Sequence, residues 1–202
     1  MLLDHITYRG PAYEADETIE GLLPGSLKGL LRQINGFVQF GGGFHLRGMC
    51  SEPNWHSLCE IMTGENALHK LYENVRETDI PFGQDCVGDQ FLLRGNEVIQ
   101  LYSETGEIEE TGLTLKEFLA EIEKDPIEFL AMEPLQQLSE DGMSLQPGKI
   151  LSVHPPFCTE ESSDGVSLKP INFWEQIAFL SDFAKQMNGI NDGDAFKIEF
   201  VD

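Results

Sequence analysis

The sequence predicts an α+β fold, in which helices pack on a mixed or antiparallel sheet and a smaller ββαβ extension follows. Helical segments with clear apolar faces occur beside short strand-like runs and a β-hairpin, and the sequence shows no internal repeat. The chain has 202 residues, enough to bury a sizeable core without disulfides. We expect one unit over residues 1–138 and an extension over residues 139–202.

The first part of the chain predicts two helices and one strand. In "LLPGSLKGLLRQINGF", apolar residues follow the i, i+3, i+4, i+7 spacing of a helix, Pro24 lies in its first turn and Gly36 ends it. The segment "VQFGGGFHLRGM" predicts a strand that is entered through a kink or bulge at its three glycines. A second helix is predicted over "ENALHKLYENVRE", because its apolar residues share one helical face.

The middle of the chain predicts a hairpin, two turns and a helix. "QFLLR" and "EVIQLY" are joined by Gly95-Asn96, a pair that suits a type II′ turn, so residues 90–102 should form a β-hairpin. "SETGE" and "GEIEE" are expected to be turns. Thr114 and Glu117 form a capping box at the start of "LTLKEFLAEI", which predicts a helix beginning there.

The composition of the sequence changes beyond about residue 140. There, "SEDGMSLQPG" is a linking segment rich in residues that break helices and strands. "KILSVHPPF" and "GVSLKPI" predict short strands, and "NFWEQIAFLSDFAKQMNG" predicts a helix with Asn172 as N-cap and Gly189 as its stop. "DAFKIEFVD" predicts a closing edge strand. Together these elements form the ββαβ extension, and we expect the apolar face of its helix to pack on the first unit.

The charge of the chain narrows the kinds of partner it can have. It carries 35 Asp and Glu against 13 Lys and Arg, a formal net charge of −22. Nucleic acid is a poor partner for such a chain, whereas basic proteins are attracted to it. No apolar run is long enough for a membrane span, the N-terminal residues do not resemble a signal peptide, and the four cysteines show no disulfide framework. We therefore expect a cytoplasmic protein with a protein partner and no membrane.

The residues form no convincing catalytic, metal or cofactor site. Cys50, His56 and Cys59 could begin a zinc site, but they lack a second pair of ligands at short spacing. The glycine run lacks the residues of a phosphate loop, and no nucleophile motif is present. Asp85 and Asp89 could act as acid and base, but carboxylates before a hairpin more often cap backbone N–H groups. We predict a protein without cofactor or metal that is not an enzyme.

The order of these features resembles the SMI1/KNR4 family of the SUKH superfamily over roughly residues 20–125. In that family an "LPxxLxxLLxxxNG" helix precedes "xFAxDGxGNxxxxD…GxVxxxxHExG". This chain departs from the pattern at Asp89, where Asn is usual, at Tyr102, where Trp is common, and at Glu104, where the His-Glu pair would begin. The positions that match are Leu23, Pro24, Asn35, Gly36, Phe82, Asp85, Gly88, Phe91 and Val98.

The resemblance implies an α+β domain whose bacterial members are largely immunity proteins, which bind and block the toxin domain encoded beside them. The expected function is therefore stoichiometric neutralisation of a cognate toxin, for which a basic nuclease would suit the charge of this chain. Fungal members of the family are interaction hubs in cell-wall synthesis and signalling, so a regulatory or scaffold role is the alternative. An enzyme that uses Asp85 and Asp89 is a further alternative.

The segment from Glu104 to Glu133 is the expected partner surface, because it holds ten acids against two lysines. Carboxylates crowded in this way repel one another, and a basic partner would relieve that repulsion and be steered to it. The residues expected to contact the partner are Glu104, Glu107, Glu109, Glu110 and Asp89.

Overall fold

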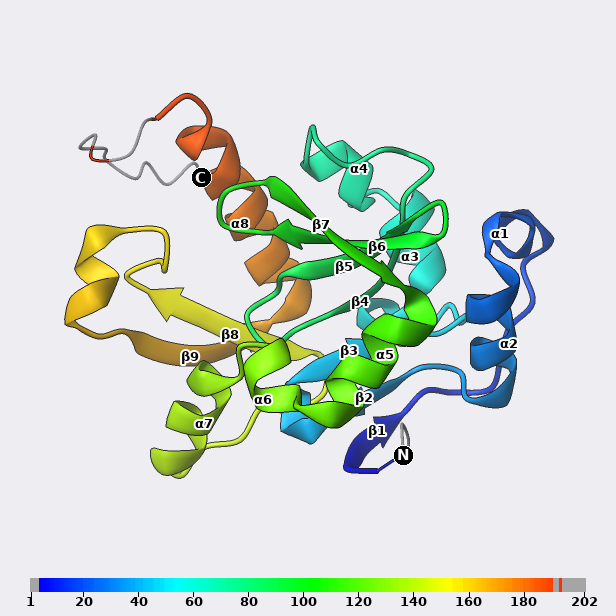
Figure 1. The fold of residues 1–202 in the computed structure, drawn as a ribbon, viewed down its shortest axis with the longest axis horizontal. Coiled ribbons are helices and arrows are strands. Elements are labelled where there is room, and N and C mark those ends of the chain that lie inside the picture. The colour runs from blue at the N-terminus through cyan, green and yellow to red at the C-terminus, as the bar shows by residue number, and fades with distance from the viewer. Residues whose placement is uncertain (1–3, 191–192, 194–202) are drawn as a thin grey trace.

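The computed structural model describes residues 4–190 and 193, and it confirms the α+β class (Figure 1). Within these residues, seven strands form one antiparallel sheet in the order β1 to β7, so each strand pairs with its neighbour in sequence. Two further strands, β8 and β9, form a separate antiparallel pair. The expected closing strand "DAFKIEFVD" lies outside the described residues.

The strands are short, and the four strands β2 to β5 at the centre of the large sheet are buried on both faces. Their bounds are β1 Ile6–Arg9, β2 Phe37–Gln39, β3 Phe44–Leu46, β4 Ile80–Gln84, β5 Gln90–Arg94, β6 Glu97–Tyr102, β7 Glu107–Thr114, β8 Lys149–His154 and β9 Ser167–Asn172.

The helices pack on the sheet and at its ends. In the part of the chain that the structure describes, no helix is long and apolar enough to cross a membrane. The α-helices are α1 Glu17–Leu22, α2 Gly25–Gln33, α3 Leu58–Thr63, α4 Leu68–Leu71, α5 Leu115–Lys124, α6 Pro126–Phe129, α7 Glu133–Glu140 and α8 Phe173–Met187, and the 3₁₀ helices are η1 Phe40–Gly42, η2 Asn54–His56 and η3 Glu160–Asp164.

Several of these elements form where short-range features of the sequence predicted them. The hairpin over residues 90–102 forms as β5 and β6, and Gly95 begins its turn with a φ of +66°. The side chain of Thr114 accepts a hydrogen bond from the Glu117 backbone, and the Glu117 carboxylate accepts one in return, so α5 begins with the expected capping box. Phe118 of α5 then packs against Phe91, with ring centroids 4.8 Å apart, and closes the core over the sheet.

Two predictions in the first half were wrong. The segment "VQFGGGFHLRGM" is not one strand but a hairpin of β2 and β3, because Phe40, Gly41 and Gly42 take positive φ and reverse the chain through η1. The helix predicted over "ENALHKLYENVRE" is a single turn, α4, and α3 before it was not predicted. The chain leaves the helix at Tyr72, whose hydroxyl donates to the backbone of Ser103, so tertiary contacts override the helical spacing.

The stretch "GEIEE" was predicted to be a turn and is instead the start of β7, the edge strand of the large sheet. Its bond pattern is interrupted by a bulge, at which Gly112 has a φ of +69° and the Thr111 hydroxyl donates to the Val98 carbonyl. The exposed carboxylates therefore stand along an open strand edge.

The segment after residue 138 shares one core with the residues before it. The predicted boundary at residue 138 falls inside α7, and α8 runs beside the β8–β9 pair at one end of the large sheet (Figure 1). Leu151, Ile177 and Leu180 belong to the same hydrophobic cluster as Phe82 and Phe91. The backbone N–H of Leu151 also donates to the Cys86 carbonyl at 2.8 Å.

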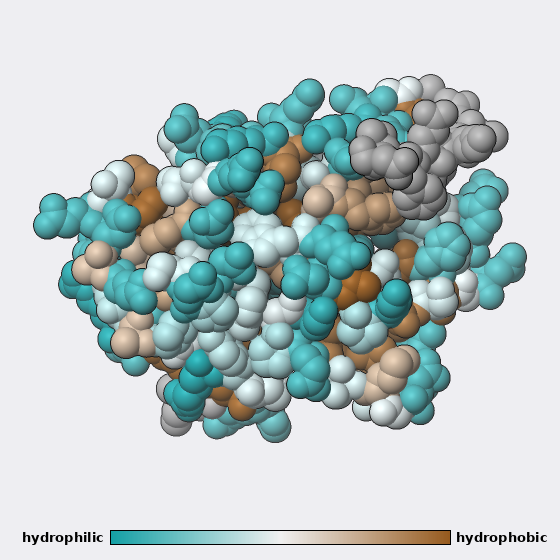
Figure 2. Space-filling view, turned by 180° about the vertical axis from the view of Figure 1, so that it is seen from behind, coloured by the Kyte–Doolittle hydropathy of each residue, from teal (hydrophilic) through white to brown (hydrophobic). Residues whose placement is uncertain are grey.

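Hydrophilic residues cover most of the face seen in Figure 2, with smaller hydrophobic areas between them. Four large hydrophobic side chains are exposed in the described part of the chain: Leu22, Ile127, Met143 and Phe157.

Candidate functional site

The loop between β4 and β5 is held by one carboxylate. Asp85 is buried, and its Oδ1 accepts hydrogen bonds from the backbone N–H groups of Val87, Gly88 and Asp89 at 3.0, 2.9 and 3.0 Å. Its own N–H donates to the Asp89 carbonyl at 3.1 Å. These bonds match the capping role that the sequence indicated for Asp85.

A side chain at Gly88 in this loop would strain the backbone and push on neighbouring side chains. Its φ is +102°, and a Cβ built on it would lie 2.9 Å from the Ile150 side chain and 3.2 Å from that of Leu180. The loop of the first unit therefore lies directly against β8 and α8 of the extension.

Asp89 joins the loop to the turn between β6 and β7. Its Oδ1 accepts from the Ser103 N–H at 2.8 Å, and the Ser103 hydroxyl donates to the Gly88 carbonyl at 2.6 Å. Burial raises the pKa of Asp89 to about 6, with the hydrogen bond from the Ser103 N–H acting to lower it and the charge of Glu104 acting to raise it. Burial and the neighbouring Asp89 charge likewise raise the pKa of Asp85 well above its ordinary value.

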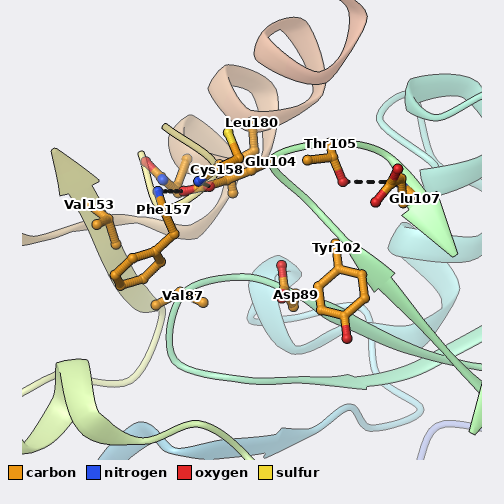
Figure 3. Close-up of a pocket in the computed structure, with 11 residues that line it drawn as sticks. Val87, Asp89, Tyr102, Glu104, Thr105, Glu107, Val153, Phe157, Cys158 and Leu180 are labelled. Atoms are coloured by element: carbon orange, nitrogen blue, oxygen red, sulfur yellow. Dashed lines mark hydrogen bonds between the residues drawn. The ribbon is translucent and has the colours of Figure 1, made fainter. Parts of the chain in front are cut away.

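A cavity of about 340 Å³ lies between this acidic loop and the extension (Figure 3). Glu104 helps to shape it, because its carboxylate accepts hydrogen bonds from the backbone N–H groups of Phe157 and Cys158 at 3.1 and 2.9 Å. The residues that line the cavity are Val87, Asp89, Tyr102, Glu104, Thr105 and Glu107 from the first unit, and Val153, Phe157, Cys158, Gln176 and Leu180 from the extension.

Gln176 is the unusual polar residue of this cavity. It lies on the side of α8 that also carries the buried Phe173, Ile177 and Leu180, and only 2% of it is exposed. Its Oε1 is buried and accepts no hydrogen bond within the described structure. Buried polar atoms are nearly always paired, so Gln176 brings an unsatisfied acceptor to the residues that line the cavity.

The carboxylates of β7 stand beside the cavity. Glu107 and Glu109 alternate with the inward-facing Ile108, and both are exposed, as is Glu110. The Tyr102 hydroxyl donates to Glu109. No Lys, Arg or His among residues 4–190 and 193 forms an ion pair with any of the three glutamates.

The structure brings part of the predicted partner surface together. Asp89, Glu104 and Glu107 line one cavity, whereas Glu109 and Glu110 lie outside it, along a shallow groove that also contains Arg94 and Arg76. Glu104, which was expected to contact the partner, accepts hydrogen bonds from the extension and forms part of the cavity wall.

Sequence reasoning missed the half of the cavity that the extension supplies, formed by Val153, Phe157, Cys158, Gln176 and Leu180. One signal was available. Gln176 is a large polar residue on the mainly apolar face of the predicted helix, where burying an amide without a hydrogen-bond partner costs free energy.

The other residues that match the family pattern hold the scaffold. Pro24 precedes α2, and Phe82 and Phe91 are in the core. The Asn35 amide donates to the carbonyls of Pro11, Ala12 and Met49 and accepts from the Met49 N–H.

Gly36, next to Asn35, also belongs to this scaffold. Its φ is +74°, and a Cβ built on it would lie 2.6 Å from the Leu46 carbonyl oxygen. Only glycine fits without movement of the backbone there.

A second polar cluster lies sealed in the core. Arg47 is 1% exposed, and its guanidinium donates to the Pro81 and Gly83 carbonyls and to the side chains of Gln84 and Gln90. Burial lowers the pKa of Arg47 to about 9. The cluster ties β3, β4 and β5 together and is closed to substrates of any size.

Histidines and cysteines form no metal centre in the described part of the chain. His45 and His56 lie with ring nitrogens 2.8 Å apart in the core, and burial lowers the pKa of His56 to about 4. Burial raises the pKa of Cys50 to about 12 and that of Cys59 to about 11. These thiols stay protonated and unreactive at neutral pH.

No family model matches the sequence, and no curated protein matches it. Among solved structures, the fold is similar to that of Atu4351 from Agrobacterium tumefaciens, with 15% sequence identity and a TM-score of 0.48 over 89% of this chain and 86% of that one. A similarity at this level carries no conclusion about function.

Proposed function

We propose that this protein is an immunity-type protein that binds a basic toxin domain and neutralises it stoichiometrically, as its resemblance to the SMI1/KNR4 family implies. The observation that carries the proposal is the row of exposed carboxylates on β7. Glu107, Glu109 and Glu110 stand on an open sheet edge, and none of them forms an ion pair with a basic side chain among the described residues. A chain with a net charge of −22 attracts a basic protein, and these carboxylates lie where such a protein can approach.

A second physical role for these charges has to be separated from partner binding. Charged residues on an edge strand keep the strand from pairing with another sheet. Lysine serves that purpose as well as glutamate does. Both side chains are charged and hydrated, and a strand that carries either of them repels another strand with the same charge. Replacing the three glutamates by lysine therefore preserves edge protection while it reverses the charge offered to a partner.

The experiment uses the C-terminal domain of the secreted protein encoded directly upstream, as an immunity protein requires. Association with the wild type is compared with that of Glu107→Lys/Glu109→Lys/Glu110→Lys by stopped flow or biosensor at several salt concentrations. We expect association to slow by roughly tenfold or more at low salt, with a difference that shrinks as ionic strength rises.

The matched control reverses the same number of charges elsewhere. Glu17, Glu65 and Glu140 are exposed and lie outside the segment from Glu104 to Glu133, so their replacement by lysine changes the net charge equally. The control variant should lose much less of the association rate. Equal losses in both variants would show that only total charge matters, and no loss in either would leave the β7 carboxylates as edge protection.

A further inference from the structure

The cavity between the acidic loop and the extension has two kinds of wall. Val87, Val153 and Leu180 give it an aliphatic side, and Asp89 and Glu107 give it an acidic side. No Lys or Arg lines it within the described structure. A ligand that fits such a space has an alkyl stem and a cationic head rich in N–H donors.

Gln176 supplies a second observation that does not depend on charge. Its buried Oε1 accepts no hydrogen bond from any of the described residues. Buried carbonyl oxygens accept a hydrogen bond in nearly every folded protein. A guanidinium group carries five N–H donors, so it can serve Gln176 and a carboxylate together.

The aromatic residues at the cavity suit the same head group. Phe157 is an exposed large hydrophobic side chain, 44% accessible, and its ring lies near Val87 at the cavity wall (Figure 3). Tyr102 lies beside Asp89 (Figure 3). Guanidinium groups stack on aromatic rings, so both rings offer a favourable surface for one.

We propose that this cavity receives one arginine side chain of the basic partner, with its guanidinium between Asp89 and Gln176 and its stem against the aliphatic wall. This inference rests on the proposed function and adds to it the residue type that anchors the complex. Buried arginines are frequent anchors of protein interfaces, and the β7 carboxylates form the rim around this one.

The test needs no toxin, so it is independent of the proposed function. The full chain is titrated with N-acetyl-arginine amide and followed by ¹H–¹⁵N NMR, with N-acetyl-citrulline amide as the uncharged probe of equal shape. We expect saturable binding of the arginine probe with a dissociation constant on the order of 1 mM, a typical value for a ligand of this size. The amides of Ser103, Phe157 and Cys158 should shift, and the citrulline probe should leave them in place.

Three variants locate the site. Asp89→Asn keeps the acceptor for Ser103 but removes the charge, and should weaken binding of the arginine probe roughly tenfold. Gln176→Leu should weaken it severalfold while leaving the melting temperature unchanged or higher, because a buried orphan oxygen is removed. Glu123→Gln, an exposed change on α5, should alter neither the binding of the arginine probe nor the melting temperature.

The outcomes separate the possible occupants of the cavity. Equal binding of the citrulline probe, or binding that ignores Asp89→Asn, overturns the proposal in favour of a neutral, water-filled cavity. Binding of agmatine without binding of the blocked arginine probe also overturns it, since the site would then take a free amine rather than a side chain. If the arginine probe binds as expected while the upstream domain does not bind the protein, the proposed function fails and the arginine site stands.

Discussion

Replacing Asp85 tests how the loop beneath the cavity is held. The Asp85 Oδ1 accepts three backbone N–H groups, and alanine removes that acceptor while leaving all three donors in place. Asparagine offers an oxygen at the same position and removes the buried charge. The two substitutions therefore separate the hydrogen bonds from the charge.

The expected loss follows from the surroundings of the three donors. The Gly88 N–H is buried, and leaving it unpaired costs about 1–3 kcal/mol, whereas the part-buried N–H groups of Val87 and Asp89 can reach water and cost about 0.5–1.5 kcal/mol each. Removal of a buried carboxylate with a raised pKa offsets part of this sum. We expect Asp85→Ala to lower the free energy of unfolding by about 3 kcal/mol and Asp85→Asn to change it by less than about 1 kcal/mol.

Urea unfolding at pH 7, followed by circular dichroism, measures both values. For a chain of this size the alanine variant should melt about 6–12 °C lower than the wild type. A loss below about 1 kcal/mol for alanine would mean that other contacts hold the loop. A loss for asparagine as large as that for alanine would mean that the charge, rather than the three hydrogen bonds, stabilises the loop.

Three further predictions concern the same region. Because the folded state raises the pKa of Asp89 to about 6, it binds a proton more readily than the unfolded chain, so the free energy of unfolding should rise as the pH falls from about 7 to about 5. The rise should be smaller in Asp89→Asn, and an identical pH profile in thermal melts of the two proteins would contradict this assignment. Gly88→Ala should cost about 2 kcal/mol in urea unfolding, because φ is +102° and the added Cβ meets Ile150, and a neutral result would show that the loop and the extension separate easily. Since Leu151, Ile177 and Leu180 share the core of the first unit, calorimetry should show one cooperative transition for the whole chain, and two separate transitions would mean that residues 1–138 and 139–202 fold independently.

Elements set by short-range chemistry could be predicted from the sequence. The hairpin around Gly95, the capping box of Thr114 and Glu117, and the helix capped by Asn172 each depend on residues within a few positions of one another. The start of β7 could not be recognised, because three of its first four residues are glutamates, which are rare in strands. Its pairing with β6 decides its conformation.

The cavity could be predicted only in part for the same reason. Asp89 and Glu107 drew attention through their charge, but the opposite wall is formed by Phe157 and Gln176, more than 45 residues further along the chain. Only the packing of the extension brings the two walls together. Helical spacing also misled at Tyr72, whose buried hydroxyl bonds across the fold to Ser103.

Titration of the toxin's activity with this protein tests the central claim most directly. The domain encoded directly upstream is assayed at a fixed concentration while the wild type, the β7 lysine variant and the lysine variant of Glu17, Glu65 and Glu140 are added in increasing amounts. We predict that activity falls to zero at one equivalent of wild type and close to that ratio for the control, whereas the β7 variant requires a large excess. Undiminished activity at a many-fold excess of wild type would contradict the account, as would equal neutralisation by the β7 variant.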